Sequence, residues 1–288
     1  MALDRLHIFE SRSTVFADSD VLQENIVLSA TRSGRREKVT ISVSRGHTDE
    51  AFVRTVRYSD VLKPDDERGF IRIPIDEAHS RAADSLETLS ARLPDLNVGV
   101  STGRVVDFRA REYLLEHPDP DTGSCPLIYP GNLRSGRVQW PLSIRKPQAI
   151  VSCTQTNKLM LPNERYVLVK RFSSKEERRR VVAVVYEPED ATGKDVGFEN
   201  HLNVFHCKGK GLDEDLARGL CLWLNSSPVD VFFRTFSGHT QVNATDLRSL
   251  PYPSREQLTR LSEALGRGAW PDQEKTDSLV ALHVFGQE

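Results

Sequence analysis

The sequence predicts an α+β fold, in which a short-stranded mixed β region is combined with helices. Short runs that alternate apolar and polar residues, separated by Gly and Pro, fill residues 1–75 and recur between residues 98 and 206. From residue 213 onward, apolar residues recur at helical spacing instead. A chain of 288 residues fits one large domain or two modest ones. The segment around Pro94 predicts a connection, which gives domains over residues 1–95 and 96–288.

The first domain is expected to hold two β-hairpins and a linker helix. Residues 20–28 lead through a turn at Ser33-Gly34 to the alternating residues 38–44, which is the pattern of a hairpin. Residues 52–58 and 69–75 predict a second strand pair.

The second domain is expected to begin with strands. Residues 98–101 predict a strand that turns at Thr102-Gly103-Arg104 and resumes over residues 105–109. The two strongest strand patterns, residues 165–172 and 180–186, predict a hairpin joined by a charged link. Further strands, beyond a loop at residues 117–124, are expected at residues 126–129, 138–140 and 201–206.

Helix start and stop signals support the helical pattern. Pro94 ends the first predicted helix, Asp213 can cap the second, and Ser227-Pro228 is a cap followed by a first-turn proline. Ser254 and Gln257 form a capping-box pattern. The predicted helices cover residues 78–92, 213–225, 227–234, 254–265 and 272–284.

Composition excludes several classes of protein. Hydrophobic residues make up 38% of the chain, yet no run approaches the ~20 apolar residues that a membrane helix needs. The N-terminus lacks a basic start followed by an apolar core, so we expect no signal peptide and no membrane partner. The four cysteines are dispersed without Cys-x-x-Cys spacing, which argues against a zinc ribbon or a disulfide scaffold. The expected location is the reducing cytoplasm.

Motifs of a self-sufficient enzyme are absent from the sequence. It contains no Gly-x-Gly-x-x-Gly, no phosphate loop, no His-Glu-x-x-His and no Gly-x-Ser-x-Gly. His201, His206 and Cys207 suggest a metal site, but residues 201 and 206 face opposite sides of a strand. We therefore assign no catalytic, cofactor-binding or metal-ligating residue.

Charge is unevenly distributed along the chain. Residues 101–180 hold 15 Lys and Arg against 8 Asp and Glu, a net charge of +7, whereas the remaining residues sum to −9. Six of these cations lie between Lys170 and Arg180, where they could neutralise phosphates, and Ser173 could add a phosphate hydrogen bond. The alternative for this segment is a solvated hairpin end with weak Lys–Glu pairs.

A polar loop over residues 236–248 follows an aromatic run. His239, Thr240, Gln241 and Asn243 carry groups that can both donate and accept hydrogen bonds, as the recognition of base edges requires. The same residue types also favour ordinary surface turns. The loop ends at Leu250-Pro251-Tyr252-Pro253, which cannot continue a helix or a central strand.

Four segments in order carry a family resemblance. They cover residues 101–109, 166–177 and 199–204 and the loop that ends at Arg248. Together they resemble the C-terminal, target recognition half of type II adenine-specific DNA methyltransferases of restriction–modification systems, over roughly residues 96–260. Residues 1–75 resemble the end of the methyltransferase sheet, where late strands form a hairpin.

The resemblance implies a DNA-binding target recognition domain with C-terminal helices. The family's Pro-Pro catalytic motif and its aromatic-x-Gly-x-Gly loop for S-adenosylmethionine are absent, so both are expected in a catalytic half outside this chain. The chain would then be an expressed fragment, a truncated gene product or one half of a split pair. The implied partners are double-stranded DNA and the catalytic domain or subunit, and a cognate restriction endonuclease is left open.

The expected DNA-binding residues are cations and polar side chains of the matched segments and of the basic stretch from Lys170 to Arg180. Asn200 and His201 are further candidates that a structural role would explain equally well. The full set is Arg104, Arg109, Lys170, Arg171, Ser173, Lys175, Arg178, Arg179, His239, Thr240, Gln241 and Asn243.

Two alternative functions are left open. One is a stand-alone DNA specificity subunit, which the similarity of residues 224–253 to type I specificity domains suggests. The other is an independent small-molecule enzyme.

Overall fold

A computed structural model describes most of the chain, and its internal contacts divide the chain into two compact units. Unit 1 comprises Met1–Ser85 and Val231–His239, and unit 2 comprises Leu86–Asp230 and Thr240–Glu288. The described residues are 2–11, 25–32, 34, 36–64, 66, 69–119, 121, 123–134, 136–174, 176–238, 240–266 and 268–287. Part of the predicted strand over residues 20–28 and the turn residue Ser33 lie outside the described residues, as do Lys175 and His239.

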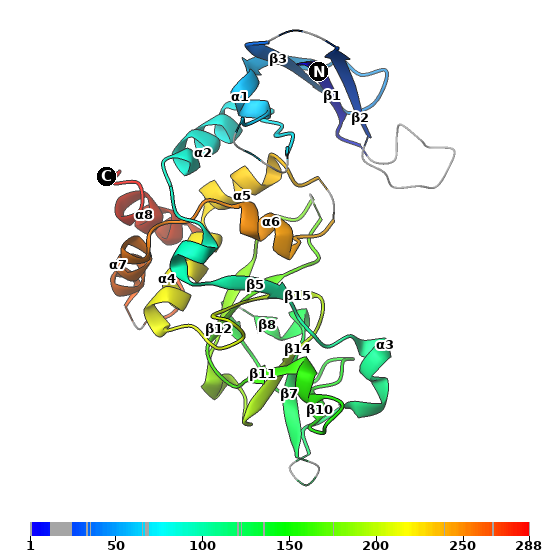
Figure 1. Ribbon diagram of the computed structural model, residues 1–288, viewed down its shortest axis with the longest axis vertical. Coiled ribbons are helices and arrows are strands. Elements are labelled where there is room, and N and C mark those ends of the chain that lie inside the picture. Colours follow the sequence, from blue (N-terminus) through cyan, green and yellow to red (C-terminus); the bar gives the residue numbers. More distant parts are fainter. Residues whose placement is uncertain are drawn as a thin grey trace. The chain divides into compact units, whose positions relative to one another are not determined.

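The sheet of unit 1 has four strands in the order β2-β1-β3-β4 (Figure 1). β1 (Ala2–Phe9) pairs antiparallel with β2 (Asn25–Thr31) and parallel with β3 (Lys38–Ser44). The predicted hairpin between residues 20–28 and 38–44 is therefore wrong, because β1 lies between the two strands. Leu6 of β1 is fully buried and joins Val39 and Ile41 of β3 in the core of this unit. β1 thus contributes Leu6 to the core from its position between β2 and β3.

The second predicted strand pair of unit 1 is also wrong. β4 (Phe52–Arg57) forms an antiparallel pair with β3, whereas residues 69–75 form no strand. In that segment Ile73 donates its N–H to the carbonyl of Thr235, and Pro74 has no N–H to offer a sheet. The Phe70 ring lies 5.4 Å from that of Phe236. Residues 69–75 are thereby held by irregular contacts inside unit 1.

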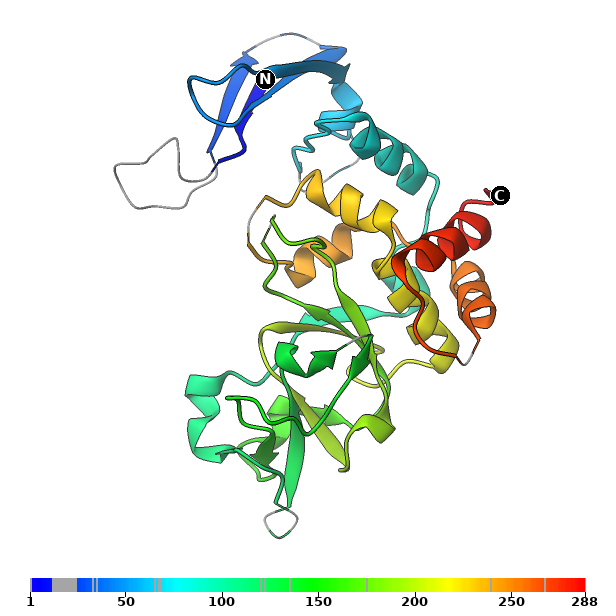
Figure 2. The same cartoon turned by 180° about the vertical axis from the view of Figure 1, so that it is seen from behind.

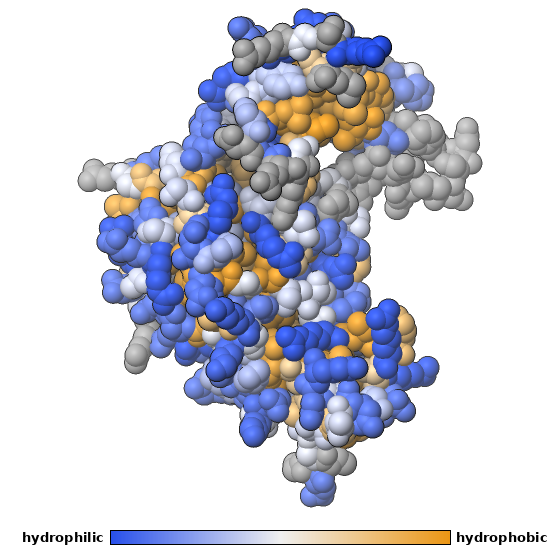
Figure 3. All heavy atoms as spheres, in the orientation of Figure 1, coloured by the Kyte–Doolittle hydropathy of each residue, from blue (hydrophilic) through white to orange (hydrophobic). Residues whose placement is uncertain are grey.

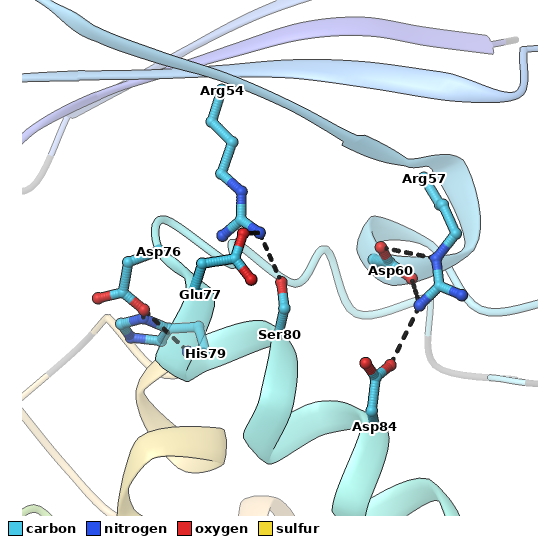
Figure 4. A network of polar contacts seen from close by, with 8 residues as sticks. All are labelled: Arg54, Arg57, Asp60, Asp76, Glu77, His79, Ser80 and Asp84. Carbon is cyan, nitrogen blue, oxygen red and sulfur yellow. Dashed lines mark hydrogen bonds and ion pairs between the residues drawn. The ribbon is translucent and has the colours of Figure 1, made fainter.

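Polar contacts attach α2 (Glu77–Glu87) to β4 within unit 1 (Figure 4). Arg54 Nη2 lies 2.8 Å from Glu77 Oε1 and 3.1 Å from Ser80 Oγ. Arg57 Nη2 lies 3.1 Å from Asp84 Oδ1. α2 confirms the predicted helix before Pro94, although it ends earlier than residue 92. The short helix α1 (Tyr58–Val61) directly follows β4.

Unit 2 contains a six-stranded sheet in the order β5-β15-β12-β13-β9-β8. Its centre is the hairpin of β12 (Tyr166–Lys170) and β13 (Ala183–Tyr186), which confirms the strongest strand prediction. β12 also pairs antiparallel with β15 (Leu202–His206), which pairs with β5 (Gly99–Thr102). The sheet is completed by β9 (Arg137–Val138) and β8 (Leu133–Arg134).

A second, five-stranded sheet of unit 2 has the order β11-β14-β7-β10-β6. An apolar core joins this sheet to the six-stranded sheet. In it, Phe198 of β14 packs against Tyr166 and Tyr186 of the six-stranded sheet, with the centroids of the three rings 5.4–6.4 Å apart. The five strands are β11 (Met160–Pro162), β14 (Asp195–Phe198), β7 (Ser124–Ile128), β10 (Ala149–Val151) and β6 (Leu114–Leu115).

The predicted continuation of a strand over residues 105–109 is wrong. Val105 forms one isolated bridge with Glu199, and the chain then enters the helix α3 (Asp107–Ala110). Asp107 accepts a hydrogen bond of 2.8 Å from the Tyr129 hydroxyl and lies 2.7 Å from Lys146 Nζ. Contacts with distant residues therefore override the local preference of Val105 and its neighbours for a strand.

The helices α4, α7 and α8 lie together in unit 2 (Figures 1 and 2). Asp213 caps the first of them by accepting the N–H of Leu216 at 3.0 Å, and Ser254 caps the second by accepting from Gln257. The predicted helices and the α+β fold class are confirmed. The five C-terminal helices are α4 (Glu214–Leu224), α5 (Ser227–Arg234), α6 (Ala244–Ser249), α7 (Arg255–Leu265) and α8 (Gln273–His283).

The remaining regular elements are single turns of 3-10 helix. One of them, Leu93–Leu96, contains Pro94 and occupies the predicted connection. No helix among the described residues is long and apolar enough to cross a membrane. The other 3-10 turns are Arg111–Tyr113, Pro130–Asn132, Asn157–Leu159 and Pro188–Asp190.

Candidate functional site

The chain just after β12 pairs with residues 240–242 of the polar loop. Val242 donates its N–H to the carbonyl of Arg171 at 2.7 Å, and Ser173 donates to the carbonyl of Thr240 at 3.1 Å. Between these two bonds, Phe172 forms an isolated antiparallel bridge with Gln241. Two segments that the sequence marks separately thus lie side by side in unit 2.

A third marked segment, residues 199–201, joins the same place. Arg171 donates its N–H to the carbonyl of His201 at 2.9 Å, and its guanidinium reaches the carbonyl of Asn200 at 3.2 Å. Asn203, which follows in β15, is fully buried and donates to the carbonyl of Val242 at 2.7 Å. We call the surface formed by residues 171–173, 200–201 and 240–241 the junction surface.

The junction surface presents one cation and several polar side chains. Arg171 Nη2 donates to Gln241 Oε1 at 3.1 Å, so the guanidinium and the amide hold each other in position. Thr240 is exposed, and the side chain of His201 is 42% exposed. Phe172 is the apolar member, with 48% of the residue exposed. The surface can therefore offer hydrogen bonds, positive charge and an aromatic face to one ligand.

A buried carboxylate supports the junction surface from below. Glu199 is 1% exposed, and its Oε1 lies 2.7 Å from His201 Nδ1 while its Oε2 accepts the N–H of His201 at 2.9 Å. Burial raises the pKa of Glu199, and the hydrogen bond and charge of His201 act in the opposite direction. Glu199 thus fixes the position of the imidazole.

The basic segment after β12 divides into exposed and internal residues. Arg178 is exposed, whereas Arg180 is fully buried and its N–H donates to Asp230 at 2.6 Å. Arg179 is half-buried; its guanidinium donates to the carbonyl of Ser226 at 3.0 Å and also bonds Gln273. The cations that the sequence groups together therefore differ in their access to solvent.

The other predicted DNA-binding residues of this segment also differ in their surroundings. Ser173 is buried and donates its hydroxyl to the carbonyl of Arg179 at 3.2 Å. Lys170 borders a depression of about 520 Å³ that Asn225 and Trp270 also line. Lys175 and His239 lie outside the described residues.

The remaining predicted residues lie on other parts of unit 2. Arg104 is exposed, and its guanidinium is 3.4 Å from the carbonyls of Lys158 and Met160. Arg109 is exposed on α3, with its guanidinium 5.4 Å from the centre of the Phe108 ring. Asn243 occupies the N-cap position of α6 and donates its N–H to Asp246 at 3.0 Å.

Sequence reasoning overlooked the two residues that hold the junction surface together. Asn203 stands between the apolar residues Leu202 and Val204 of β15, and a buried amide of this kind requires a hydrogen-bond partner, so its position is a usable signal. Glu199 gives no comparable signal, because its partner is its close neighbour His201. Among the described residues, no group of three or more His, Cys, Asp or Glu is arranged to hold a metal ion.

The chain is homologous to type II methyltransferases. It is 43% identical over 272 residues to the Type II methyltransferase M.BsuBI of Bacillus subtilis, covering 91% of this chain and 52% of that protein. It is 40% identical over 283 residues to the Type II methyltransferase M.PstI of Providencia stuartii, covering 97% and 55%. The chain thus spans about half the length of these relatives. No protein-family model matches it.

Two solved restriction–modification enzymes share the fold. The type IIG restriction endonuclease BpuSI has a TM-score of 0.50 and 11% identity, over 98% of this chain and 41% of that one. The type IIL restriction-modification enzyme MmeI, solved in complex with DNA, has a TM-score of 0.50 and 10% identity, over 100% and 43%. Both likenesses support the α+β architecture.

Proposed function

We propose that this chain is the DNA target recognition portion of a type II, adenine-specific DNA methyltransferase. The observation that carries the proposal is the junction surface, where three segments distant in sequence bring Arg171, His201 and Gln241 together. Side chains of these types bind phosphates and the edges of bases. Homology to half of two type II methyltransferases agrees with this role.

Phosphate contacts would supply most of the affinity. The exposed cations Arg104, Arg109 and Arg178 belong to the part of the chain that carries a net charge of +7. Such side chains attract the DNA backbone without reading its sequence. Thr240 and Gln241 are the residues that we assign to base edges or to the backbone beside them, because they follow one another at the junction surface.

Methyl transfer itself is assigned to a catalytic half that this chain lacks. The sequence contains neither a Pro-Pro pair nor an aromatic-x-Gly-x-Gly segment, so no residue of this chain is proposed to bind S-adenosylmethionine or the flipped adenine. The chain's contribution would be to hold and orient the duplex while the catalytic half acts on the extruded base.

Unit 1 offers a surface that suits attachment of this catalytic half. Ile26, Ile8, Val43 and Phe52 are successive cross-strand partners, so their side chains share one face of the sheet. Ile26 is 48% and Phe52 61% exposed, and Figure 3 shows hydrophobic side chains gathered on the sheet. Val43 is buried and Ile8 packs against the core of unit 1, so the exposed apolar side chains are those of the edge strands β2 and β4. Such exposed apolar side chains are typical of a protein interface. We assign it to the catalytic half, since the relatives are about twice as long as this chain.

A salt titration with duplex DNA tests the proposed function. With three to four phosphate contacts we expect binding to weaken by about a hundredfold between 50 and 200 mM salt. The chain alone, given S-adenosylmethionine and duplex DNA, should transfer no methyl group. Undetectable binding at low salt, or binding that salt leaves unchanged, would contradict DNA recognition, and methyl transfer by the chain alone would contradict the division of labour.

A further inference from the structure

Phe172 leaves a large part of its ring in water. Among the described residues of unit 2, the large hydrophobic residues with high exposure are Phe108, Phe172 and Leu282. Phe172 differs from the other two because it lies in the junction surface. Burying such a ring against a ligand would be favourable, since apolar surface gains free energy in proportion to the area removed from water.

The backbone that carries the ring is held on both sides. The preceding residue, Arg171, accepts the N–H of Val242 at 2.7 Å, and the following residue, Ser173, donates to Thr240 at 3.1 Å. Phe172 itself is bridged to Gln241. A backbone held in this way does not have to be ordered when a ligand covers the ring.

The imidazole of His201 lies against the Phe172 ring. The two ring centroids are 4.8 Å apart and the planes are inclined by 58°. His201 is itself held by the buried carboxylate of Glu199, whose oxygens lie 2.7 Å from Nδ1 and 2.9 Å from the backbone nitrogen of His201. Phe172 and His201 thus form a preorganised aromatic pair, which we call the aromatic platform.

The surroundings of the aromatic platform are polar and cationic rather than apolar. Arg171 and Gln241 are bonded side by side at 3.1 Å, and Thr240 is exposed. A protein partner would be met by a wider apolar area, whereas a nucleobase needs one aromatic face with hydrogen-bonding groups and positive charge around it.

From this arrangement we propose that Phe172, supported by His201, stacks on a nucleobase that has left the duplex stack and is not the adenine assigned to the catalytic half. The proposal rests on the proposed function, because DNA must first occupy the junction surface. It adds that this surface recognises a locally opened duplex, in which an unpaired base exposes its face. Aromatic side chains of proteins stack on bases of any sequence in this way.

The test compares two labelled duplexes of the same sequence, one fully paired and one with a single extrahelical base. The full chain and the variants Phe172→Ala, Phe172→Leu and Phe172→Trp are titrated with each. The extrahelical base should strengthen binding to the wild type, and Phe172→Ala should lose about five- to a hundredfold of affinity for that duplex alone. Phe172→Trp should keep the preference, and its added indole fluorescence should be quenched by the extrahelical base.

Phe172→Leu separates stacking from packing, since leucine retains apolar volume but has no ring. If Phe172→Leu keeps the preference for the extrahelical base, or if the wild type shows no preference, the stacking proposal is overturned while DNA recognition stands. If the wild type binds neither duplex at low salt, the proposed function fails and the stacking proposal fails with it. Phe108→Ala is the matched control, because Phe108 is 76% exposed on α3 and should leave the preference unchanged.

Discussion

Asn203 in β15 donates a hydrogen bond of 2.7 Å to the carbonyl of Val242, and both residues are fully buried. This bond joins the six-stranded sheet of unit 2 to a segment that contains no strand of its own. The polar loop is therefore placed by one buried amide together with the backbone bonds of Arg171 and Ser173. The loop's position thus depends in part on a side chain that does not reach the surface.

Replacing Asn203 with alanine should destabilise the chain by about 1–3 kcal/mol, because the buried carbonyl of Val242 loses its side-chain donor. Urea unfolding measures the loss. Asn157→Ala is the control, since Asn157 is exposed at the start of a 3-10 turn and should change stability by less than about 0.5 kcal/mol. Equal unfolding midpoints for Asn203→Ala and the wild type would show that the bond is unimportant.

Gly103 permits a close approach of two backbones beside the junction surface. A Cβ atom at this position would lie 2.2 Å from the carbonyl oxygen of Glu199 and 2.6 Å from that of Phe198. Gly103→Ala must therefore displace the segment that carries His201. We expect a loss of about 1–3 kcal/mol in stability and weaker DNA binding.

A matched glycine tests whether this effect is steric. Gly268 has open space where a Cβ would be, so Gly268→Ala should unfold at the same urea concentration as the wild type or slightly above it. If Gly103→Ala and Gly268→Ala are equally stable, the close approach of Gly103 to Glu199 does not affect the free energy of unfolding.

Elements with strong local signals were predictable from sequence, and their assembly was not. The β12–β13 hairpin follows from two continuous apolar runs rich in valine, and α4 and α7 follow from their caps at Asp213 and Ser254. The predicted hairpin of the N-terminal sheet is wrong, because β1 lies between β2 and β3 and buries Leu6 there. Sequence patterns state which face of a strand is apolar but not which strand will cover it.

In the candidate site, too, the residues could be predicted from the sequence but their arrangement could not. Charge and polar composition identified Arg171, Thr240 and Gln241, yet their meeting depends on hydrogen bonds between residues 70 positions apart. The sequence also does not show which cations of a charged run are buried. Arg180 is fully buried although the exposed Arg178 lies only two residues before it, and nothing in the composition of the run distinguishes the two.

Arg178 and Arg180 should therefore respond in opposite ways to alanine substitution. Arg178→Ala should lower the slope of log affinity against log salt by about one, with stability unchanged, as expected for a lost phosphate contact. Arg180→Ala should lower stability by about 1–3 kcal/mol through lost packing and leave the slope unchanged. DNA titration and urea unfolding of both variants provide the comparison.

Arg260→Ala is the control for these two variants, because Arg260 is exposed on α7, outside the basic part of the chain. It should match the wild type in both measurements. A normal salt slope for Arg178→Ala would remove Arg178 from the phosphate contacts, and a stable Arg180→Ala would show that the buried guanidinium is dispensable.

His206 should make the stability of unit 2 sensitive to acid. Burial lowers the pKa of His206 from its ordinary value of 6.5, and the charges of Arg104 and Arg248 lower it further. The N–H of Gly209 donates to Nδ1 at 3.1 Å, and Nε2 lies 3.1 Å from Ser101 Oγ, so the imidazole is built into the structure in its neutral form.

Because the unfolded chain binds this proton more readily, the free energy of unfolding should fall as the pH drops below about 6.5 and through the folded pKa. His206→Asn keeps an acceptor near the position of Nδ1 but cannot titrate, so its stability should depend less on pH between about 5 and 7. Urea unfolding across this range and NMR titration of the His206 ring measure both effects. A measured pKa of 6.5 or above, or equal pH dependence in the variant and the wild type, would refute this account.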